Sequence, residues 1–256
     1  GIAGHCENDG PLGAWLLGET LRKLGTPVVY LTDRHCAAAL RSVGLTPVET
    51  EPHKVHDATH LVAIERAGRA ADGGYRNVRG ADIRASTEPL DSLFIEAPKR
   101  RVVTVAVGDG GNEIGMGNVY ELIADRERHD PIPHGPAIGC VVPADHLIVA
   151  GVSNWGGEAL AVGTGLLANR VEAVPTTEAL AARMERLIEA GFGNLEDALD
   201  LLVGLDARAA QALFTAVLEE RSHGGAGARV ELTLCAPSVP GSLSADALHT
   251  AKDVRS

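Results

Sequence analysis

A glycine-rich acidic loop, placed directly after an apolar β-branched run, constrains the fold of this chain most. Residues 101–107 predict a strand that is buried on both faces. The loop 108–117 follows at once, and a helix is expected over residues 118–128. In an open parallel sheet, such loops gather at the carboxyl ends of the strands, where ligands bind. The sequence therefore predicts a ligand site at that edge of a parallel sheet.

Strand, polar loop and helix alternate along the rest of the chain. Helices are expected over residues 11–24, 36–43, 89–99, 158–169 and 177–190, and strands over 28–31, 46–49, 60–65, 139–142 and 146–150. This order predicts an α/β fold: a mostly parallel sheet flanked by helices, with Gly-rich loops at the strand C-terminal ends and a helical C-terminal part.

One domain is expected over residues 1–256. Within it, residues 174–224 are expected to be helical, including helices over 195–202 and 207–221, and to form a cap or the outer layer of the same domain. Residues 225–256 lose all periodicity and predict an irregular tail.

Charge and composition exclude several classes of partner. The chain has 23 basic and 34 acidic side chains, a net charge of −11, which argues against general binding to nucleic acid. Only 3% of its residues are aromatic, so platforms for stacking bases are not expected. No apolar stretch approaches the roughly 18 residues of a membrane-spanning helix. Nucleic acid and membranes are therefore not expected partners.

The cysteines and the start of the chain bear on its location. Four cysteines lie far apart without a Cys-x-x-Cys pair, which predicts free thiols in a reducing compartment. We expect a cytoplasmic protein. Because the chain opens at Gly1 and enters a Gly-rich motif at once, an organellar targeting segment upstream stays open as an alternative. A homo-oligomer is compatible with the sequence.

The acidic residues of the loop 108–117 select against phosphate. The dinucleotide fingerprint is broken because Glu113 stands where it requires glycine, and the loop lacks the lysine of a phosphate-binding loop. Asp109 and Glu113 instead suit a ligand with ammonium and carboxylate ends, or a hard divalent cation. The alternative is a tight turn whose acidic side chains only cap the next helix.

Arginines cluster after the strand expected over residues 60–65. The four are Arg66, Arg69, Arg76 and Arg79. Guanidinium groups pair bidentately with carboxylates, so this basic cluster in an acidic protein predicts a site for an acidic substrate. The alternative is a structural ion network in which Glu65 and Asp72 hold some of the arginines.

Two further polar segments precede helices. Residues 7–13 and 151–158 place short polar side chains at a helix N-terminus, where free backbone N–H groups favour an anion. N-capping by Asp9 or Asn154 explains each segment equally well. A separate group, His53, His56 and His60, has spacing that is compatible with metal ligands.

Four motifs carry a resemblance to a known family. They are Glu7 to Ala14, Ile64 to Gly73, Gly108 to Gly117 and Gly151 to Gly157. In this order they are similar to the D-glutamate cyclase family, and the similarity covers roughly residues 7–170. The resemblance implies conversion of D-glutamate to 5-oxo-D-proline with loss of water and without an organic cofactor.

The roles assigned within this hypothesis follow from the chemistry of cyclisation. Binding of the substrate's α-carboxylate is assigned to Arg66, Arg69 or Arg79. Deprotonation of the amine is assigned to Asp109 or Glu113. Proton donation is assigned to Asp9 or Glu7. The remaining predicted contacts to substrate or oxyanion are Gly110, Gly111, Asn112, Ser153, Asn154 and Trp155.

Two other functions stay open. One is a non-catalytic sensor that binds an amino acid or another anion in the same pocket. The other is a metal-dependent hydrolase of a small cyclic amide or phosphoester, built on Asp109, Glu113 and the three histidines. No resident metal is expected under the cyclase hypothesis; a divalent cation at Asp109 and Glu113 is the alternative. The expected partner is a small acidic amino acid.

Overall fold

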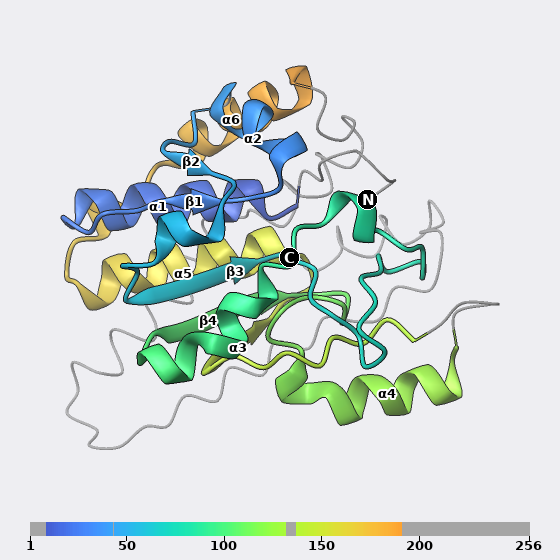
Figure 1. Cartoon of the computed structure of the whole chain (residues 1–256). Helices are drawn as coiled ribbons and strands as arrows, with labels where there is room; N and C mark the ends of the chain where they lie inside the picture. Colours follow the sequence, from blue (N-terminus) through green and yellow to red (C-terminus); the bar gives the residue numbers. More distant parts are fainter. Residues whose placement is uncertain (1–8, 43, 132–136, 191–256) are drawn as a thin grey trace, which may run out of the picture. The chain divides into compact units, whose positions relative to one another are not determined.

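The computed structural model describes residues 9–42, 44–131 and 137–190. All of them belong to one compact unit. In chain order the main elements are α1 (Pro11–Lys23), β1 (Tyr30–Leu31), α2 (Arg34–Ser42), β2 (Val48–Glu49), β3 (His60–Ile64), α3 (Asp91–Arg100), β4 (Val103–Gly108), α4 (Tyr120–His129), β5 (His146–Val149), α5 (Ser153–Leu167) and α6 (Thr177–Glu189) (Figure 1).

Both sheets of the described chain are parallel, which confirms the α/β class. Strands β1 and β2 form a two-stranded sheet, and β3, β4 and β5 form a three-stranded sheet with β4 in the centre. In its register Ile64 pairs with Val107, and Val107 pairs with Ile148. The three carboxyl ends are therefore level, and the loops that follow them leave from one edge.

Helices cover both faces of the three-stranded sheet. Because neighbouring strand residues point to opposite faces, Ala106 and Val107 of β4 mark the two sides. Ala106 belongs to a core that includes Phe94 of α3. Val107 faces Gly156 of α5, where an added Cβ would lie 2.4 Å from the valine side chain. Helix α5 therefore crosses one face, and α3 packs against the other.

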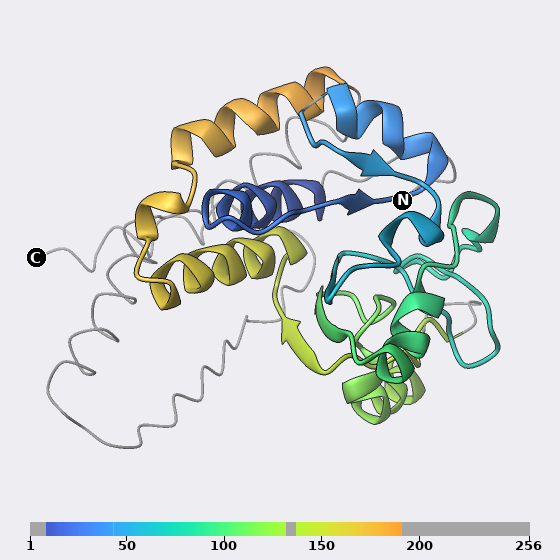
Figure 2. The ribbon, with the colours of Figure 1, turned by 60° about the vertical axis from the view of Figure 1, so that its left-hand side comes forward.

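Helices α1 and α5 lie along each other with almost no space between their backbones (Figure 2). A Cβ added at Gly157 would lie 2.8 Å from the Cα of Gly13. This approach lets the Gly13 N–H donate to Oδ1 of Asn154 at 3.0 Å. The two glycines thus fix the start of α1 beside the start of α5.

Two predicted elements differ from the structure. Helix α5 begins at Ser153, whereas we predicted a turn over residues 151–157 and a helix only from Glu158. Gly156 and Gly157 serve close packing inside the helix rather than a turn. Residues 139–142 form no strand; Cys140 makes an isolated bridge to Ala70, because this segment bonds to loop backbone instead of to a strand.

The cysteines correct another expectation. Cys36 is disulfide-bonded, so the prediction of four free thiols is wrong. Cys140 is a free, buried thiol. The helix predicted over residues 177–190 is confirmed by α6. The helices predicted over 195–202 and 207–221, and the tail over 225–256, lie outside the described residues. No helix among the described residues is long and apolar enough to cross a membrane.

The close contact of α1 and α5 generates a prediction with a control on the same helix. The substitution Gly157→Ala forces the two backbones apart and should destabilise the protein by about 1–3 kcal/mol relative to Gly163→Ala. An added Cβ at Gly163 meets no atom within 4 Å, so Gly163→Ala should stabilise by up to about 1 kcal/mol through helix propensity. Urea unfolding measures both; equal effects would contradict the packing.

Candidate active site

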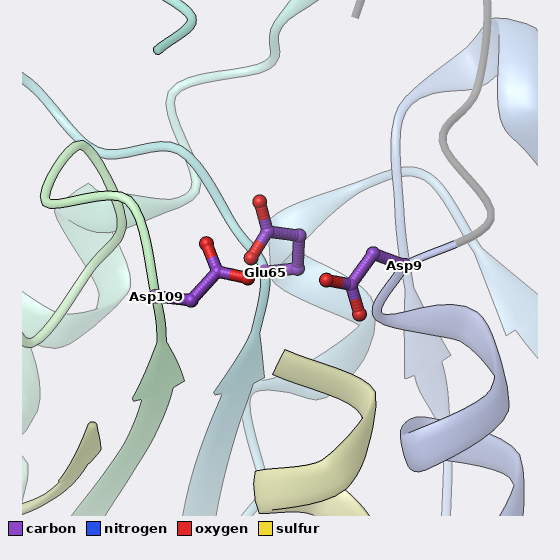
Figure 3. A group of neighbouring side chains, drawn as sticks. All are labelled: Asp9, Glu65 and Asp109. Carbon is purple, nitrogen blue, oxygen red and sulfur yellow. The ribbon is translucent and has the colours of Figure 1, made fainter. Parts of the chain in front are cut away.

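Three carboxyl groups meet at the carboxyl edge of the three-stranded sheet. Asp9 lies two residues before the start of α1, Glu65 follows β3, and Asp109 follows β4. Each of the three residues offers one carboxylate oxygen, and these three oxygens all lie within 4.8 Å of one another. Figure 3 shows the three side chains pointing toward one another above the first turn of a helix, α5. The parallel register therefore brings Glu65 and Asp109 together, and the segment before α1 adds Asp9.

The N-terminus of α5 supplies hydrogen-bond donors to all three groups. The Ser153 N–H donates to Asp9 Oδ2 at 3.1 Å and to Asp109 Oδ2 at 3.2 Å. The Ser153 hydroxyl donates to Glu65 Oε2 at 2.5 Å, and the Asn154 N–H donates to Asp9 Oδ1 at 2.6 Å. Free N–H groups and the helix dipole favour negative charge at this end of a helix. The start of α5 thus organises the cluster.

The backbone of Glu65 is held in an unusual conformation. Its φ of 52° lies in the left-handed region, which residues other than glycine rarely adopt. Gly10 lies directly against it, since a Cβ at Gly10 would approach the Cβ of Glu65 to 2.9 Å. Strained backbone of this kind is concentrated at functional sites. Here it occurs at the residue whose side chain lies between Asp9 and Asp109 (Figure 3).

Burial and mutual repulsion separate the pKa values of the cluster. Burial, followed by the charges of Glu113 and Asp109, raises the pKa of Glu65 to about 9. Burial and the charges of Glu113 and Asp9 raise the pKa of Asp109 to about 7. At neutral pH Glu65 therefore carries a proton, and Asp109 is divided between its two forms. Two like groups with separated pKa values are the arrangement of an acid and a base.

Glu113 has a different environment from the one we expected. It is buried, and its two carboxylate oxygens accept the N–H groups of Gly110 at 3.0 Å and Gly111 at 2.8 Å. The N–H groups of both glycines, which we predicted as substrate contacts, are therefore bonded within their own loop. Burial raises the pKa of Glu113. Its proximity raises the pKa of Glu65 and Asp109, so it acts on the cluster through its charge.

Asn112 fixes the same loop to its neighbour. Its side-chain NH2 group donates to the backbone carbonyl of Arg76 at 2.9 Å, and its backbone carbonyl accepts the N–H of Gly68 at 2.9 Å. Its Oδ1 is buried and has no hydrogen-bond partner among the described residues. The loop after β4 and the arginine-rich loop after β3 are thus joined through their backbones.

The arginines are mostly engaged by acidic partners. Arg66 pairs bidentately with Asp33 at 2.6 and 2.7 Å. Arg69 pairs bidentately with Asp91, whose carboxylate is fully buried and also accepts the hydroxyl of Tyr75. These contacts favour the structural ion network for Arg66 and Arg69.

Of the other two arginines, Arg76 forms an ion pair and Arg79 is exposed. Arg76 pairs with Asp72, as the network alternative proposed. Glu65 does not join this network, because it turns into the acidic cluster instead. Arg79 is exposed, and its guanidinium forms no ion pair with any residue in the described ranges. Its predicted role in binding substrate stays a prediction.

The remaining predicted residues divide by position. Ser153 and Asn154 are buried in the first turn of α5, and Trp155 is half-buried beside them. Glu7 lies outside the described residues. His60 opens β3 at the end of the strand opposite Glu65, and His53 and His56 are exposed. The structure therefore does not bring the histidines to Asp109.

Two acidic residues of this region were missed in the sequence. Glu65 follows a strand end as Asp109 does, and this shared position was the available signal. Glu158 in α5 is only 9% exposed, and burial together with the charge of Asp9 raises its pKa to about 7. No signal in the sequence distinguished Glu158 from an exposed helical glutamate.

Asp9, Glu65 and Asp109 also have the chemistry of a site for a hard divalent cation, which binds carboxylate oxygens. Asp109 was predicted as a metal candidate. Glu113, the second candidate, directs its oxygens to backbone N–H groups instead.

The raised pKa of Glu65 generates a prediction for stability. A group whose pKa is higher in the folded than in the unfolded protein favours folding at low pH and loses this contribution as pH rises. Wild-type protein should therefore lose stability between pH 5 and pH 9. The variant Glu65→Gln should lose less, by at least about 1.4 kcal/mol, the equivalent of one pKa unit. Urea unfolding at both pH values measures this; parallel losses would contradict the assignment.

Comparison with known proteins is consistent with the four motifs. A sequence model described as D-glutamate cyclase-like, C-terminal, matches residues 3–194. A stretch of 103 residues is 55% identical to the protein named D-glutamate cyclase, mitochondrial, of Homo sapiens, and it covers 40% of this chain and 16% of that relative. The matched stretch thus spans about a sixth of the relative's length. Because the family model covers most of the chain, this protein belongs to the D-glutamate cyclase-like family.

Proposed function

We propose that this chain binds D-glutamate and cyclises it to 5-oxo-D-proline with loss of water, as a lyase. The observation that carries the proposal is the close approach of the Glu65 and Asp109 carboxyl groups, whose pKa values are raised to about 9 and about 7. Cyclisation needs a base at the amine and an acid at the γ-carboxyl group. Family membership and the name of the human relative support the choice of substrate.

The reaction balances on this pair. Asp109 takes one proton from the α-ammonium group, and Glu65 gives its proton to an oxygen of the γ-carboxylate. The amine nitrogen then attacks the carbon of the γ-carboxyl group and forms the C–N bond. The nitrogen loses a second proton, which passes through Glu65 to the hydroxyl group, and the C–O bond breaks to release water. Exchange across the cluster returns the proton on Asp109 to Glu65.

The two charged ends of the substrate require different partners. The acidic cluster suits the ammonium end, since no lysine, arginine or histidine among the described residues forms an ion pair with Asp9, Glu65 or Asp109. For the α-carboxylate we retain Arg79, because Arg66 and Arg69 are already bonded to buried aspartates. The proton from Glu65 neutralises one oxygen of the γ-carboxylate before attack. Stabilisation of the oxyanion that forms on attack stays our prediction for Asn112 and Asn154, because the N–H groups of Gly110 and Gly111 are bonded to Glu113.

The remaining expectations accompany this proposal. We propose a reaction that needs no organic cofactor, with a divalent cation at the cluster as the alternative. A cytoplasmic location remains our prediction, although the human relative is named as mitochondrial. A sensor that binds the amino acid without converting it is the second candidate, and it would use the same ammonium-binding cluster.

Proton NMR of the full chain with D-glutamate tests the proposal. We expect 5-oxoproline to form from the D isomer, with L-glutamate and glutamine unchanged and no effect of EDTA. Asp109→Asn and Glu65→Gln should each reduce turnover at least about 100-fold, the lower range for general acid–base catalysis. Glu185→Gln, an exposed site on α6, is the control. Binding without product would favour the sensor, and loss of activity with EDTA a metal-dependent enzyme.

The pH dependence of kcat/KM gives a second test. Activity needs Asp109 without its proton and Glu65 with its proton. The rate should therefore rise as pH passes about 7 and fall as pH passes about 9, following the raised pKa values of the two groups. The conservative variant Asp109→Glu should move the acid limb and leave the alkaline limb in place. An acid limb near pH 4, the ordinary range of a carboxyl group, would contradict the assignment.

A further inference from the structure

Glu158 is a buried carboxyl group that has no role in the packing of the fold described above or in the proposed acid–base pair. It lies in α5, is 9% exposed, and accepts no hydrogen bond from any residue that the structure describes. Its carboxyl oxygens keep a small contact with solvent, since the fully enclosed unpartnered atoms of the described residues are Arg66 Nε and Asn112 Oδ1. A carboxylate that is mostly buried nevertheless normally has a hydrogen-bond donor. No described residue donates a hydrogen bond to the Glu158 carboxyl group, which points to donors supplied by a bound molecule.

The geometry of α5 directs Glu158 toward the acidic cluster. Glu158 follows Asn154 by four residues, so the two share one face of the helix. Helical side chains lean toward the N-terminus, which carries the carboxyl group of Glu158 back along the turn of Asn154. The N–H of Asn154 is bonded to Asp9 at 2.6 Å, and the charge of Asp9 acts on Glu158. Glu158 therefore lies on the Asp9 side of the cluster.

The donors at the start of α5 do not serve Glu158. The Ser153 N–H is shared by Asp9 and Asp109, the Ser153 hydroxyl is bonded to Glu65, and the Asn154 N–H is bonded to Asp9. Asp9 receives a further N–H, from Gly10, at 2.8 Å. The protein thus stabilises negative charge on Asp9 with several donors and offers none of these to Glu158.

We propose that Glu158 and Asp9 together form the subsite for the ammonium group of an amino-acid ligand, so that Glu158 determines selection for an amine. This inference rests on the proposed function for the identity of the ligand. An ammonium group presents three N–H donors and a positive charge, which matches a mostly buried acceptor that lacks a donor among the described residues. Asp109 and Glu65, on the β4 and β3 side, are left to exchange protons with the substrate.

The test compares two ligands that differ in the amine alone. D-Glutamate and glutarate share both carboxylates, but glutarate has no amine. Isothermal titration calorimetry of the full chain should show that Glu158→Gln weakens D-glutamate about tenfold or more, in the range of a lost charge-assisted hydrogen bond. Binding of glutarate should stay unchanged. Glu158→Asp, which retains the charge on a shorter side chain, should restore part of the affinity for D-glutamate.

Controls separate a binding role from a structural one. Glu158→Gln should fold with an unchanged or higher thermal midpoint, because it removes a buried ionisable group, and Glu185→Gln on the exposed face of α6 should bind as wild type does. In turnover, KM for D-glutamate should rise about tenfold, with a much smaller change in kcat. Equal weakening of D-glutamate and glutarate would overturn the ammonium subsite.

The outcomes also distinguish this inference from the proposed function. If wild type converts D-glutamate and Glu158→Gln has the same KM, the proposed function stands and the inference is wrong. If D-glutamate binds without conversion and Glu158→Gln weakens it selectively, the inference stands and the proposed function is wrong. A titration with Mn²⁺ alone tests whether Glu158 binds a divalent metal ion instead of an ammonium group. If Glu158→Gln loses affinity for Mn²⁺ and keeps affinity for D-glutamate, Glu158 is a metal ligand and the inference is overturned.

Discussion

Electrostatic repulsion among carboxyl groups that cannot all ionise together is the constraint on which this site depends. Asp9, Glu65 and Asp109 have oxygens within 4.8 Å of one another. Repulsion at that distance is partly offset because the first turn of α5 donates hydrogen bonds to all three. Burial, together with this repulsion, raises the pKa of Glu65 and Asp109, so that bound protons offset the rest. The helix start and the bound protons together keep the cluster in place.

The fold provides this arrangement through backbone contacts rather than through a rigid set of side chains. Gly13 and Gly157 bring α1 and α5 together, which places Asp9 over the start of α5. The level register of β3 and β4 places Glu65 and Asp109 beside each other. Loop backbone bonds, such as that from Gly68 to Asn112, hold the two strand ends together. Each acidic residue is thus positioned by a different pair of elements.

Sequence patterns predicted the edge of the sheet well and the partners of its side chains poorly. The β-branched run of β4 correctly indicated a parallel strand in the centre of a sheet. The arginines were harder, because a guanidinium group pairs equally well with a substrate or with a distant aspartate such as Asp91. Asp91 is 22 residues away from Arg69 in the sequence. Only the fold shows that this aspartate, and not Glu65, is the partner.

Direct titration of the site carboxyl groups tests the central claim, that the cluster keeps protons at neutral pH. Carbon NMR of protein labelled at the side-chain carboxyl carbons follows each group, and the signals lost in Glu65→Gln and in Asp109→Asn assign two of them. If this claim holds, the Glu65 signal titrates near pH 9 and the Asp109 signal near pH 7. Titration of both signals near pH 4, as for ordinary carboxyl groups, would contradict it.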